Sequence, residues 1–338
     1  MTAKTSPESE LLVGGQALIE GVMMRSPGAY GIAVRRPDGS IALQRGKVAS
    51  LAKRYPFLKL PVLRGVAVLF QSLAIGIRAL NFSAEQAMAQ PDQPAPETAP
   101  EGAEPKKEEK ASSWAIAGSM AFGIGAGVLF FIFLPLWLTQ LGEKFLFGHL
   151  SSLAFNLVDD GLRALFFLGY IFAISRMKDI HRVFQYHGAE HKVVFNYEKA
   201  LPLTVENARV QSRLHPRCGT SFLLFVLLVS ILVFALIPKT APFLVKFGGR
   251  LVLVPLIAGL SYEVLRITAK RRAAPLFALL VAPGLALQRI TTQEPTDDML
   301  EVGIAALAEA LREDGLMEEP AEAASAAVAI SAAVLPLG

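Results

Sequence analysis

Hydrophobic and polar residues alternate in the first sixty residues of the chain. Every second position is apolar on both sides of Pro37-Asp38-Gly39: Tyr30, Ile32 and Val34 before it, and Ile41 and Leu43 after it. Alternation with a period of two on either side of a turn sequence predicts a β-hairpin. We therefore expect residues 1–60 to form a small soluble α+β domain that contains this hairpin.

From Pro61 to Phe82 the spacing of apolar residues becomes helical. Arg64, Gln71 and Arg78 recur every seven residues, which places them near one face of an otherwise aliphatic helix. Thirteen residues separate the two arginines. A membrane span requires ~20 apolar residues. Residues 61–88 are therefore expected to form an amphipathic helix that lies in the membrane interface.

Four apolar stretches farther along the chain are long enough to cross a bilayer. They are Trp114–Leu138, Leu153–Ile174, Ser221–Ile237 and Leu251–Ile267. Residues 113–175 hold the first two and residues 221–290 the other two, and a loop at 176–220 joins the pairs. The pattern thus predicts four transmembrane helices in two hairpins.

The remaining segments are shorter or more polar. Ala273–Leu287 is apolar but broken by prolines, which predicts a re-entrant or interfacial segment. An amphipathic helix is expected within 291–317, with one apolar stripe formed by Leu300, Ile304, Leu307 and Leu311. Residues 89–112, rich in Pro, Glu, Ala and Lys, are expected to be a disordered linker, and 318–338 a low-complexity tail.

Composition agrees with the pattern. The chain is 53% hydrophobic and only 18% charged, which is too apolar for an ordinary soluble protein. The expected fold is therefore mainly α: a polytopic membrane protein with about four transmembrane helices, an interfacial helix and a small N-terminal soluble α+β segment. A single cysteine excludes an intramolecular disulfide.

The basic residues predict the orientation and the partner. They cluster before the first and third spans and after the second and fourth: Lys106, Lys107, Lys110, Arg176, Lys178, Arg182, Arg213, Arg217, Lys270, Arg271 and Arg272. All these clusters fall on one side, so the two termini and the 176–220 loop are expected in the cytosol. The net charge of +4 is modest and lies beside apolar runs, which favours a lipid bilayer as partner and argues against nucleic acid.

The 176–220 loop contains the residues most suited to chemistry. Apolar residues at 180, 183, 184, 194 and 195 mark one helix face, and His187 and His191 occupy positions on it. Glu190 lies beside them, so three polar groups converge on a face expected to be buried. The spacing His187-x-x-Glu190-His191 matches an inverted zinc-protease motif, in which two histidines bind zinc and the glutamate is the base. The other interpretation is a pair of hydrogen-bonded histidines without metal.

A catalytic zinc usually has three protein ligands. His215 and Cys218 are candidates because they precede the third span on the same side as His187. Glu263 is another, since an acidic residue inside a span is a functional hypothesis. The alternatives are an ion pair between Glu263 and Arg266, and a small buried Cys218 at a helix start.

The glycine-rich stretch from Gly14 to Arg25 matches neither a phosphate-binding loop nor a dinucleotide-binding fingerprint. Its simplest interpretation is a tight turn with a surface pair between Glu20 and Arg25. Glu20 and Arg25 are also candidates for contacts with a substrate or with the side chains that surround the metal ligands.

Three motifs resemble the YqhQ-like family of bacterial membrane proteins. They are Gly-Gly-Gln-Ala-Leu-Ile-Glu-Gly-Val-Met-Met-Arg near the start, Tyr-His-Gly-Ala-Glu-His-Lys at 186–192, and Ser-Arg-Leu-His-Pro-Arg-Cys-Gly-Thr-Ser-Phe at 212–222. The resemblance runs from about Gly14 to Leu311, apart from the linker. Members are commonly labelled predicted metal-dependent enzymes. The resemblance therefore implies a bacterial inner membrane, a divalent metal, and functional importance for the residues of the second and third motifs.

These residues lead to two functional hypotheses from different classes. The first is a zinc-dependent membrane hydrolase, in which Glu190 activates water and the substrate or protein partner lies at the cytosolic face. The second is a non-catalytic scaffold or assembly factor in which His187, His191, His215 and Cys218 form a closed structural zinc site. A transporter that uses Glu263 is a weaker third, because the spans show no repeat and few polar groups.

Overall fold

The computed structural model describes residues 13–48, 55–88, 118–119, 121–216, 218–238, 240–270 and 275–318. The predicted linker at 89–112 lies outside the described residues, as do the predicted tail beyond 318 and the first residues of the Trp114–Leu138 stretch.

The N-terminal segment forms a four-stranded antiparallel sheet in the order β1-β2-β3-β4. The strands are β1 (Gly14–Leu18), β2 (Gly21–Arg25), β3 (Ala29–Arg35) and β4 (Ile41–Lys47). The predicted hairpin is confirmed as β3 and β4, with Arg35 opposite Ile41. The interpretation of the glycine-rich stretch as a turn alone was wrong. It contains two strands that are joined at Ile19 and Glu20, and Glu20 takes a positive φ of 52° to close the tight turn.

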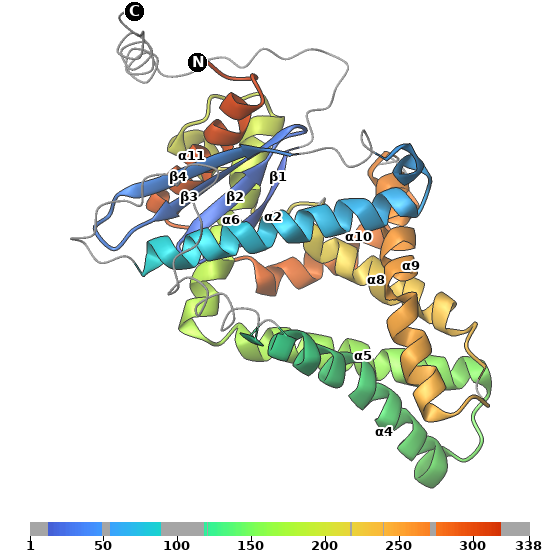
Figure 1. The fold of residues 1–338 in the computed structure, drawn as a ribbon. Coiled ribbons are helices and arrows are strands. Elements are labelled where there is room, and N and C mark those ends of the chain that lie inside the picture. The colour runs from blue at the N-terminus through green and yellow to red at the C-terminus, as the bar shows by residue number, and fades with distance from the viewer. Residues whose placement is uncertain are drawn as a thin grey trace, which may run out of the picture.

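Both faces of the sheet are covered. Val22, Met24 and Ala33 pack with helices α6 (Lys178–Glu198) and α11 (Asp297–Glu313). On the other face, Met23 and Ile32 pack against α2 (Leu63–Ala87). Because side chains alternate between the two faces, β2 must be apolar at successive positions, and only its last residue is partly exposed. The sheet, α6 and α11 therefore share one core, although they are far apart in the sequence (Figure 1).

The other described helices lie on the far side of α2 from the sheet (Figure 1). They are α4 (Leu134–Gly142) between the π-helical turns η2 (Leu129–Phe133) and η3 (Glu143–Phe147), α5 (Ser152–Ile174), α8 (Gly219–Phe234), α9 (Phe243–Lys270) and α10 (Pro275–Thr291). Short helices η1 (Pro56–Lys59) and α7 (Val205–Arg209) lie in the connections.

By length and composition, three described helices could cross a membrane: Leu63–Ala87, Ala121–Phe147 and Phe243–Ile267. These apolar helices indicate a membrane protein. Helices occur at all four predicted spans, but α5 contains Asp159, Asp160 and Arg163, and the apolar part of α8 is short. Four spans therefore stay a prediction.

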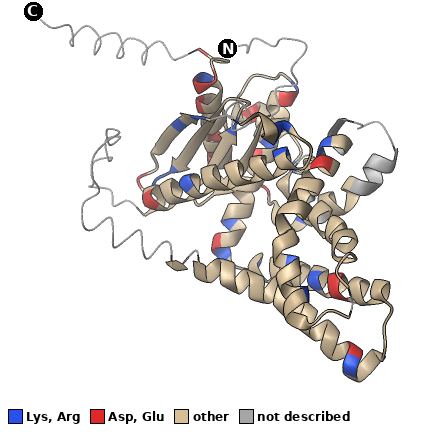
Figure 2. Ribbon diagram, turned by 45° about the vertical axis from the view of Figure 1, so that its right-hand side comes forward, with Lys and Arg blue, Asp and Glu red and all other residues tan. Residues whose placement is uncertain are grey.

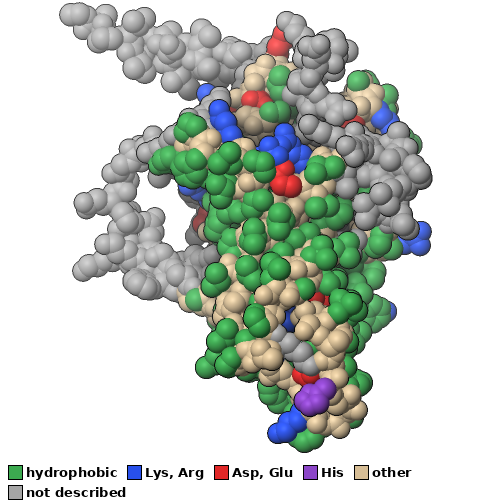
Figure 3. Space-filling view, turned by 90° about the vertical axis from the view of Figure 1, so that its right-hand side faces the viewer, with side chains coloured by type: hydrophobic (Ala, Val, Ile, Leu, Met, Phe, Trp, Pro, Cys, Tyr) green, Lys and Arg blue, Asp and Glu red, His purple; other side chains and the backbone are tan. Residues whose placement is uncertain are grey.

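Charge separates the molecule into two parts. Most charged positions lie on the sheet and the helices around it, while the long helices below are mainly uncharged, apart from a few positions along them and at their lower end (Figure 2). A broad band of apolar side chains covers one face, with charged side chains at both ends of the band (Figure 3). This distribution is the one expected for a body with a polar head and a lipid-facing stem.

The apolar segment that contains Pro275 and Pro283 forms one continuous helix, α10, which packs against α8, and its re-entrant or interfacial placement stays a prediction. One prediction about a helix boundary was wrong. The fourth apolar helix begins at Phe243 and not at Leu251, so Lys246 and Arg250 lie on α9 and not in a loop. The amphipathic C-terminal helix is confirmed as α11, and its buried stripe includes Leu300, Leu307 and Leu311.

Candidate metal centre

The predicted helix around the histidine motif is α6. The spacing of three and four residues places His187, Glu190 and His191 on one face of it. Glu190 and His191 are buried, with 6% and 2% of their surface exposed, and His187 is half-buried. The convergence of these polar groups in a buried position was therefore correctly predicted.

Gly188 lets the segment that follows α10 pack against α6. A Cβ atom at this position would overlap the carbonyl oxygen of Gln293, whose backbone N–H donates a hydrogen bond to the carbonyl of Phe184 (2.8 Å). Only glycine permits this close approach, so Gly188 lets the segment that follows Thr291 lie against α6.

Cys218, just before α8, completes a cluster with the two histidines of α6. One ligand atom from each of His187, His191 and Cys218 lies within 4.8 Å of the others. His187 Nε2 is 3.1 Å from Cys218 Sγ, and the two imidazole rings are 4.5 Å apart between centroids. We call these three residues the triad.

Two backbone carbonyls orient the imidazoles. His187 Nδ1 lies 2.7 Å from the carbonyl oxygen of Thr291, and His191 Nδ1 lies 2.5 Å from that of Arg213. A carbonyl only accepts hydrogen bonds, so each Nδ1 carries the proton and each Nε2 presents its lone pair. His191 Nε2 is buried and has no hydrogen-bond partner among the described residues. This arrangement fits a metal ion, because metal-binding histidines usually donate their other N–H to such a group.

Glu190 lies next to the triad. Its Oε2 is 3.5 Å from His191 Nε2. Strand β1 covers it, since a Cβ at Gly15 would be 2.7 Å from Glu190 Cγ. Burial raises the pKa of Glu190, and the nearby His187, His215 and the backbone of Gly15 oppose this only in part. The N-terminal sheet thus closes over the carboxylate and removes it from water.

The pKa of His191 is lowered, as is required of an imidazole that binds metal. Burial lowers this pKa, and contact with Cys218 opposes the change. A lowered pKa keeps the imidazole neutral at physiological pH, which is the form that binds metal.

His215 lies beside the triad without joining it. Its Nε2 is 3.2 Å from Glu198 Oε1, and its ring centroid is 5.7 Å from that of His191. Gln288 of α10 holds its backbone by two hydrogen bonds, of 2.7 and 2.8 Å. The imidazole of His215 is therefore engaged with a carboxylate.

The structure places Glu263 with other partners. Its carboxylate pairs with Arg64 of α2, with Nε 2.6 Å from Oε1, and accepts a hydrogen bond from the backbone N–H of Val62 (3.3 Å). Its ion-pair partner is thus Arg64, while Arg266, the expected partner, attracts it more weakly. The pair connects the beginning of α2 to α9.

The expected pair between Glu20 and Arg25 does not form. Glu20 pairs with Arg182 of α6 (2.6 Å) and accepts a hydrogen bond from the hydroxyl of Tyr186 (3.3 Å). Arg25 donates to Ser72 of α2 (3.1 Å). Glu20 therefore connects the β1–β2 turn to the helix that carries the triad.

Sequence reasoning missed the residues that orient the triad. Thr291 and Arg213 act through their backbone carbonyls, and a carbonyl belongs to every residue type. No residue pattern could have identified them.

The comparisons with known proteins place this site in a family. The sequence profile of the family described as "Protein of unknown function (DUF1385)" matches residues 60–313. "Uncharacterized protein YqhQ" of Bacillus subtilis (strain 168) is 39% identical over 313 residues, which are 90% of this chain and 94% of that protein. No solved structure matches the chain. Since the profile covers well over half of the chain, including the triad and Glu190, the chain belongs to the DUF1385 family and is related to the YqhQ protein.

Proposed function

We propose that this protein is a metal-dependent membrane enzyme, a hydrolase that acts at the cytosolic membrane face. His187, His191 and Cys218 hold the metal, and Glu190 is the catalytic base. The proposal rests on the carbonyl hydrogen bonds of both Nδ1 atoms, together with ligand atoms of His187, His191 and Cys218 that lie within 4.8 Å of one another. Two imidazoles and a thiolate favour zinc over magnesium.

The position of Glu190 supports a catalytic role. Three protein ligands leave a fourth position open, as in catalytic zinc sites. Zinc bound there would lower the pKa of a water molecule and polarise a substrate carbonyl or phosphoryl group. Glu190 lies within 3.5 Å of His191 Nε2, so it is close enough to take a proton from a group at the open position.

The alternative is a structural zinc site in a scaffold or assembly factor, with His215 as fourth ligand. The contact between His215 Nε2 and Glu198 disfavours it, because this nitrogen faces a carboxylate. The zinc measurements described below distinguish this structural site from the catalytic one.

We further propose that the protein spans a bacterial inner membrane four times, with both termini in the cytosol. Asp159 is paired with Arg163 and Arg250, which lowers the cost of placing α5 in lipid. Helix α2 lies in the interface: one face packs on the sheet, and the other exposes Leu69, Phe70 and Leu73. The lipid bilayer is then one partner, and the substrate or a protein partner approaches the triad from the cytosol.

Metal content tests the proposal. Full-length protein is purified in detergent, and zinc is measured by mass spectrometry. We expect near-stoichiometric zinc in the wild type, and loss of zinc in His187→Ala, His191→Ala and Cys218→Ser, because each removes a ligand. The control His181→Ala, on an exposed position of the same helix, should retain zinc.

Three other variants separate the competing assignments. Glu190→Gln and Glu263→Gln should retain zinc, because neither residue is assigned as a ligand. Loss of zinc in His215→Ala would favour the closed scaffold site. Absence of zinc from the wild type, or zinc that is unaffected by the two α6 histidine substitutions, would contradict the metal centre.

A further inference from the structure

Strand β1 is one edge of the sheet and runs beside the proposed metal centre. It pairs with β2 on one side, and no strand of the described residues pairs with its other side (Figure 1). Gly15 is exposed and Ala17 is half-buried, whereas Leu18 is fully buried. An edge strand presents backbone N–H and C=O groups that can pair with another extended chain.

The β1–β2 register identifies which backbone groups of β1 point away from the sheet. Leu18 and Gly21 flank the two-residue turn and lie opposite each other, so they form a hydrogen-bonded pair. Because such pairs alternate along an antiparallel ladder, Gln16 also bonds to β2, and the N–H and C=O groups of Gly15 and Ala17 point outward. No backbone hydrogen bond outside the sheet joins Ala17 to another residue that the structure describes.

Glu190 contacts this outward edge. The backbone N–H of Gly15 donates a hydrogen bond to the Glu190 carboxylate, and Glu190 Oε2 lies 3.5 Å from His191 Nε2. The outward edge of β1 therefore faces the triad. Of the triad, only His187 is partly exposed, so the metal centre is open to solvent at the end of the motif that this residue occupies.

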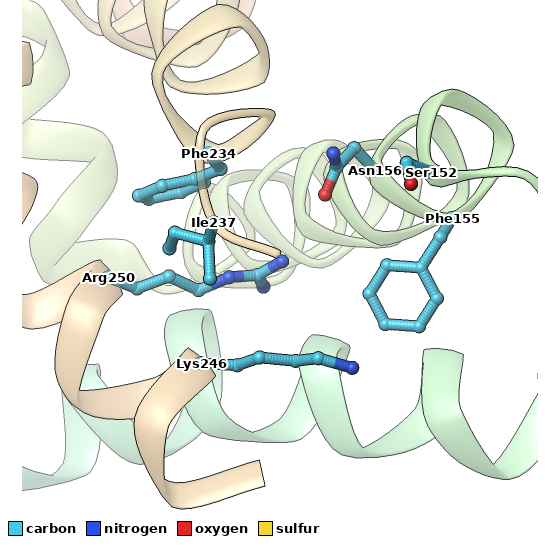
Figure 4. A pocket seen from close by; sticks show the side chains of 7 residues that line it. All are labelled: Ser152, Phe155, Asn156, Phe234, Ile237, Lys246 and Arg250. Atoms are coloured by element: carbon cyan, nitrogen blue, oxygen red, sulfur yellow. The ribbon is translucent and has the colours of Figure 1, made fainter. Parts of the chain in front are cut away.

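The pocket between α5 and α9 does not provide a substrate site. Lys246 of α9 extends there toward Asn156 of α5 (Figure 4), but the volume of the pocket is about 10 Å³, which is room for a single water molecule. The pocket also borders Phe234, the last residue of α8, whereas Cys218 precedes the first. A substrate of the proposed hydrolase must bind closer to the triad, where the outward edge of β1 lies.

We propose that the substrate of the hydrolase is an extended polypeptide, which pairs with the outward edge of β1 as an added antiparallel strand. This inference rests on the proposed function. One substrate residue exchanges both of its backbone hydrogen bonds with Ala17. The substrate residue two positions closer to the C-terminus donates its N–H to the carbonyl of Gly15. The carbonyl of that second residue finds no donor on β1, because Glu190 already accepts the N–H of Gly15.

Glu190 thereby determines which peptide bond is cleaved. The pairing ends at the substrate residue opposite Gly15, and the carbonyl of this residue lies beside Glu190 and the open position of the metal. Water adds to that carbonyl carbon and the C–N bond that follows it breaks. The proton that Glu190 takes from the water passes to the amine that leaves.

Binding of hydroxamates to the zinc-containing full-length protein in detergent tests the pairing, with titration calorimetry as the measurement. Acetyl-trialanine hydroxamate carries its metal-binding group at the position of the reacting carbonyl, and hexanohydroxamate carries the same group on an alkyl chain. We expect the peptide probe to bind roughly tenfold more tightly. N-methylation of its first or third alanine should abolish this gain, and N-methylation of the second should not, because only alternate N–H groups face β1.

Ala17→Pro tests the pairing from the side of the protein. Proline at an outward-facing position of an edge strand removes one N–H and leaves the bonds to β2 in place. We expect roughly tenfold weaker binding of the peptide probe and unchanged binding of hexanohydroxamate. The matched control is Leu43→Pro on β4, the other edge strand, where the N–H of the exposed Leu43 also points outward. Unchanged melting temperature and zinc content show that the variants are folded, and the methylated probes need no variant.

Failure of the pairing and failure of the metal centre give different results. Equal binding of the two hydroxamates, equal effects of methylation at all three nitrogens, or equal losses in Ala17→Pro and Leu43→Pro would overturn the polypeptide assignment and leave the metal centre intact. Tighter binding of hexanohydroxamate would also overturn it and would indicate an apolar substrate such as a lipid. Binding of neither hydroxamate to the zinc-containing protein would contradict the open coordination position, and this inference with it.

Discussion

At the scale of single residues, position determines chemistry more than residue type does. His187 and His191 are suited to metal because two carbonyls from distant segments accept their Nδ1 protons. One of these carbonyls belongs to Thr291, two residues before Gln293, whose own carbonyl lies where a Cβ at Gly188 would be. Gly188 is therefore a positioning residue for the triad.

Substitution Gly188→Ala tests this role. The added methyl group would overlap the Gln293 carbonyl, so Thr291 should move away from His187. We expect a loss of roughly 1–3 kcal/mol in stability, together with weaker zinc retention. Thermal unfolding and zinc content measure the two effects. The control is Gly161→Ala in α5, where a Cβ meets no atom within 4 Å. Zinc retention equal to that of the wild type would exclude a positioning role.

At the scale of elements, α2 illustrates why hydropathy alone does not assign a span. It is long and apolar enough to cross a membrane, yet Ser83 donates a hydrogen bond to Ile19 in the β1–β2 turn (2.6 Å), and Gln86 accepts one from Arg36 (2.7 Å). A helix bound along one face to a sheet with charged strands is expected to lie flat on the membrane.

Labelling of single cysteines at the two ends of α2 tests its placement. In a Cys218→Ser background, Leu63→Cys and Met88→Cys should both react with a membrane-impermeant maleimide from the cytosolic side, because an interfacial helix has both ends there. Val210→Cys and Leu146→Cys, both highly exposed, are the controls for the cytosolic and the opposite side. Reaction of the two ends from opposite sides would show that α2 spans the membrane.

At the scale of the whole molecule, the polar head is assembled from segments that the apolar helices separate. Leu300, Leu307 and Leu311 of α11 pack in one core with Val22 and Met24 of β2. The sheet therefore depends on the far end of the chain, and the triad lies between the head and the apolar helices.

Substitution Leu307→Ala tests this dependence. Leu307 is fully buried, so its truncation should cost roughly 2–5 kcal/mol. Hydrogen exchange should increase in the β2 and β3 peptides as well as in α11. The control is Glu301→Ala, which removes only a surface pair with Arg35 (2.9 Å) and should cost less than about 1 kcal/mol. Increased exchange confined to α11 would mean that the sheet is stable on its own.

The spacing of apolar residues along the chain predicted those helices and strands whose formation depends on neighbouring residues. The alternation around Pro37-Asp38-Gly39 predicted the β3–β4 hairpin, and the apolar stripe after Thr296 predicted α11. Both patterns are reliable because backbone geometry sets how often a side chain returns to the same face of a strand or a helix. The helical spacing of His187, Glu190 and His191 likewise placed them together on one buried face.

Only the tertiary structure decided which distant groups meet. Cys218 lies with the two histidines, His215 contacts Glu198, Glu263 pairs with Arg64, and Arg250 of α9 pairs with Asp159 of α5. The physical reason is that these contacts join segments separated by tens to hundreds of residues. Their choice depends on packing and on the pairing of buried charges, which no local period along the chain encodes.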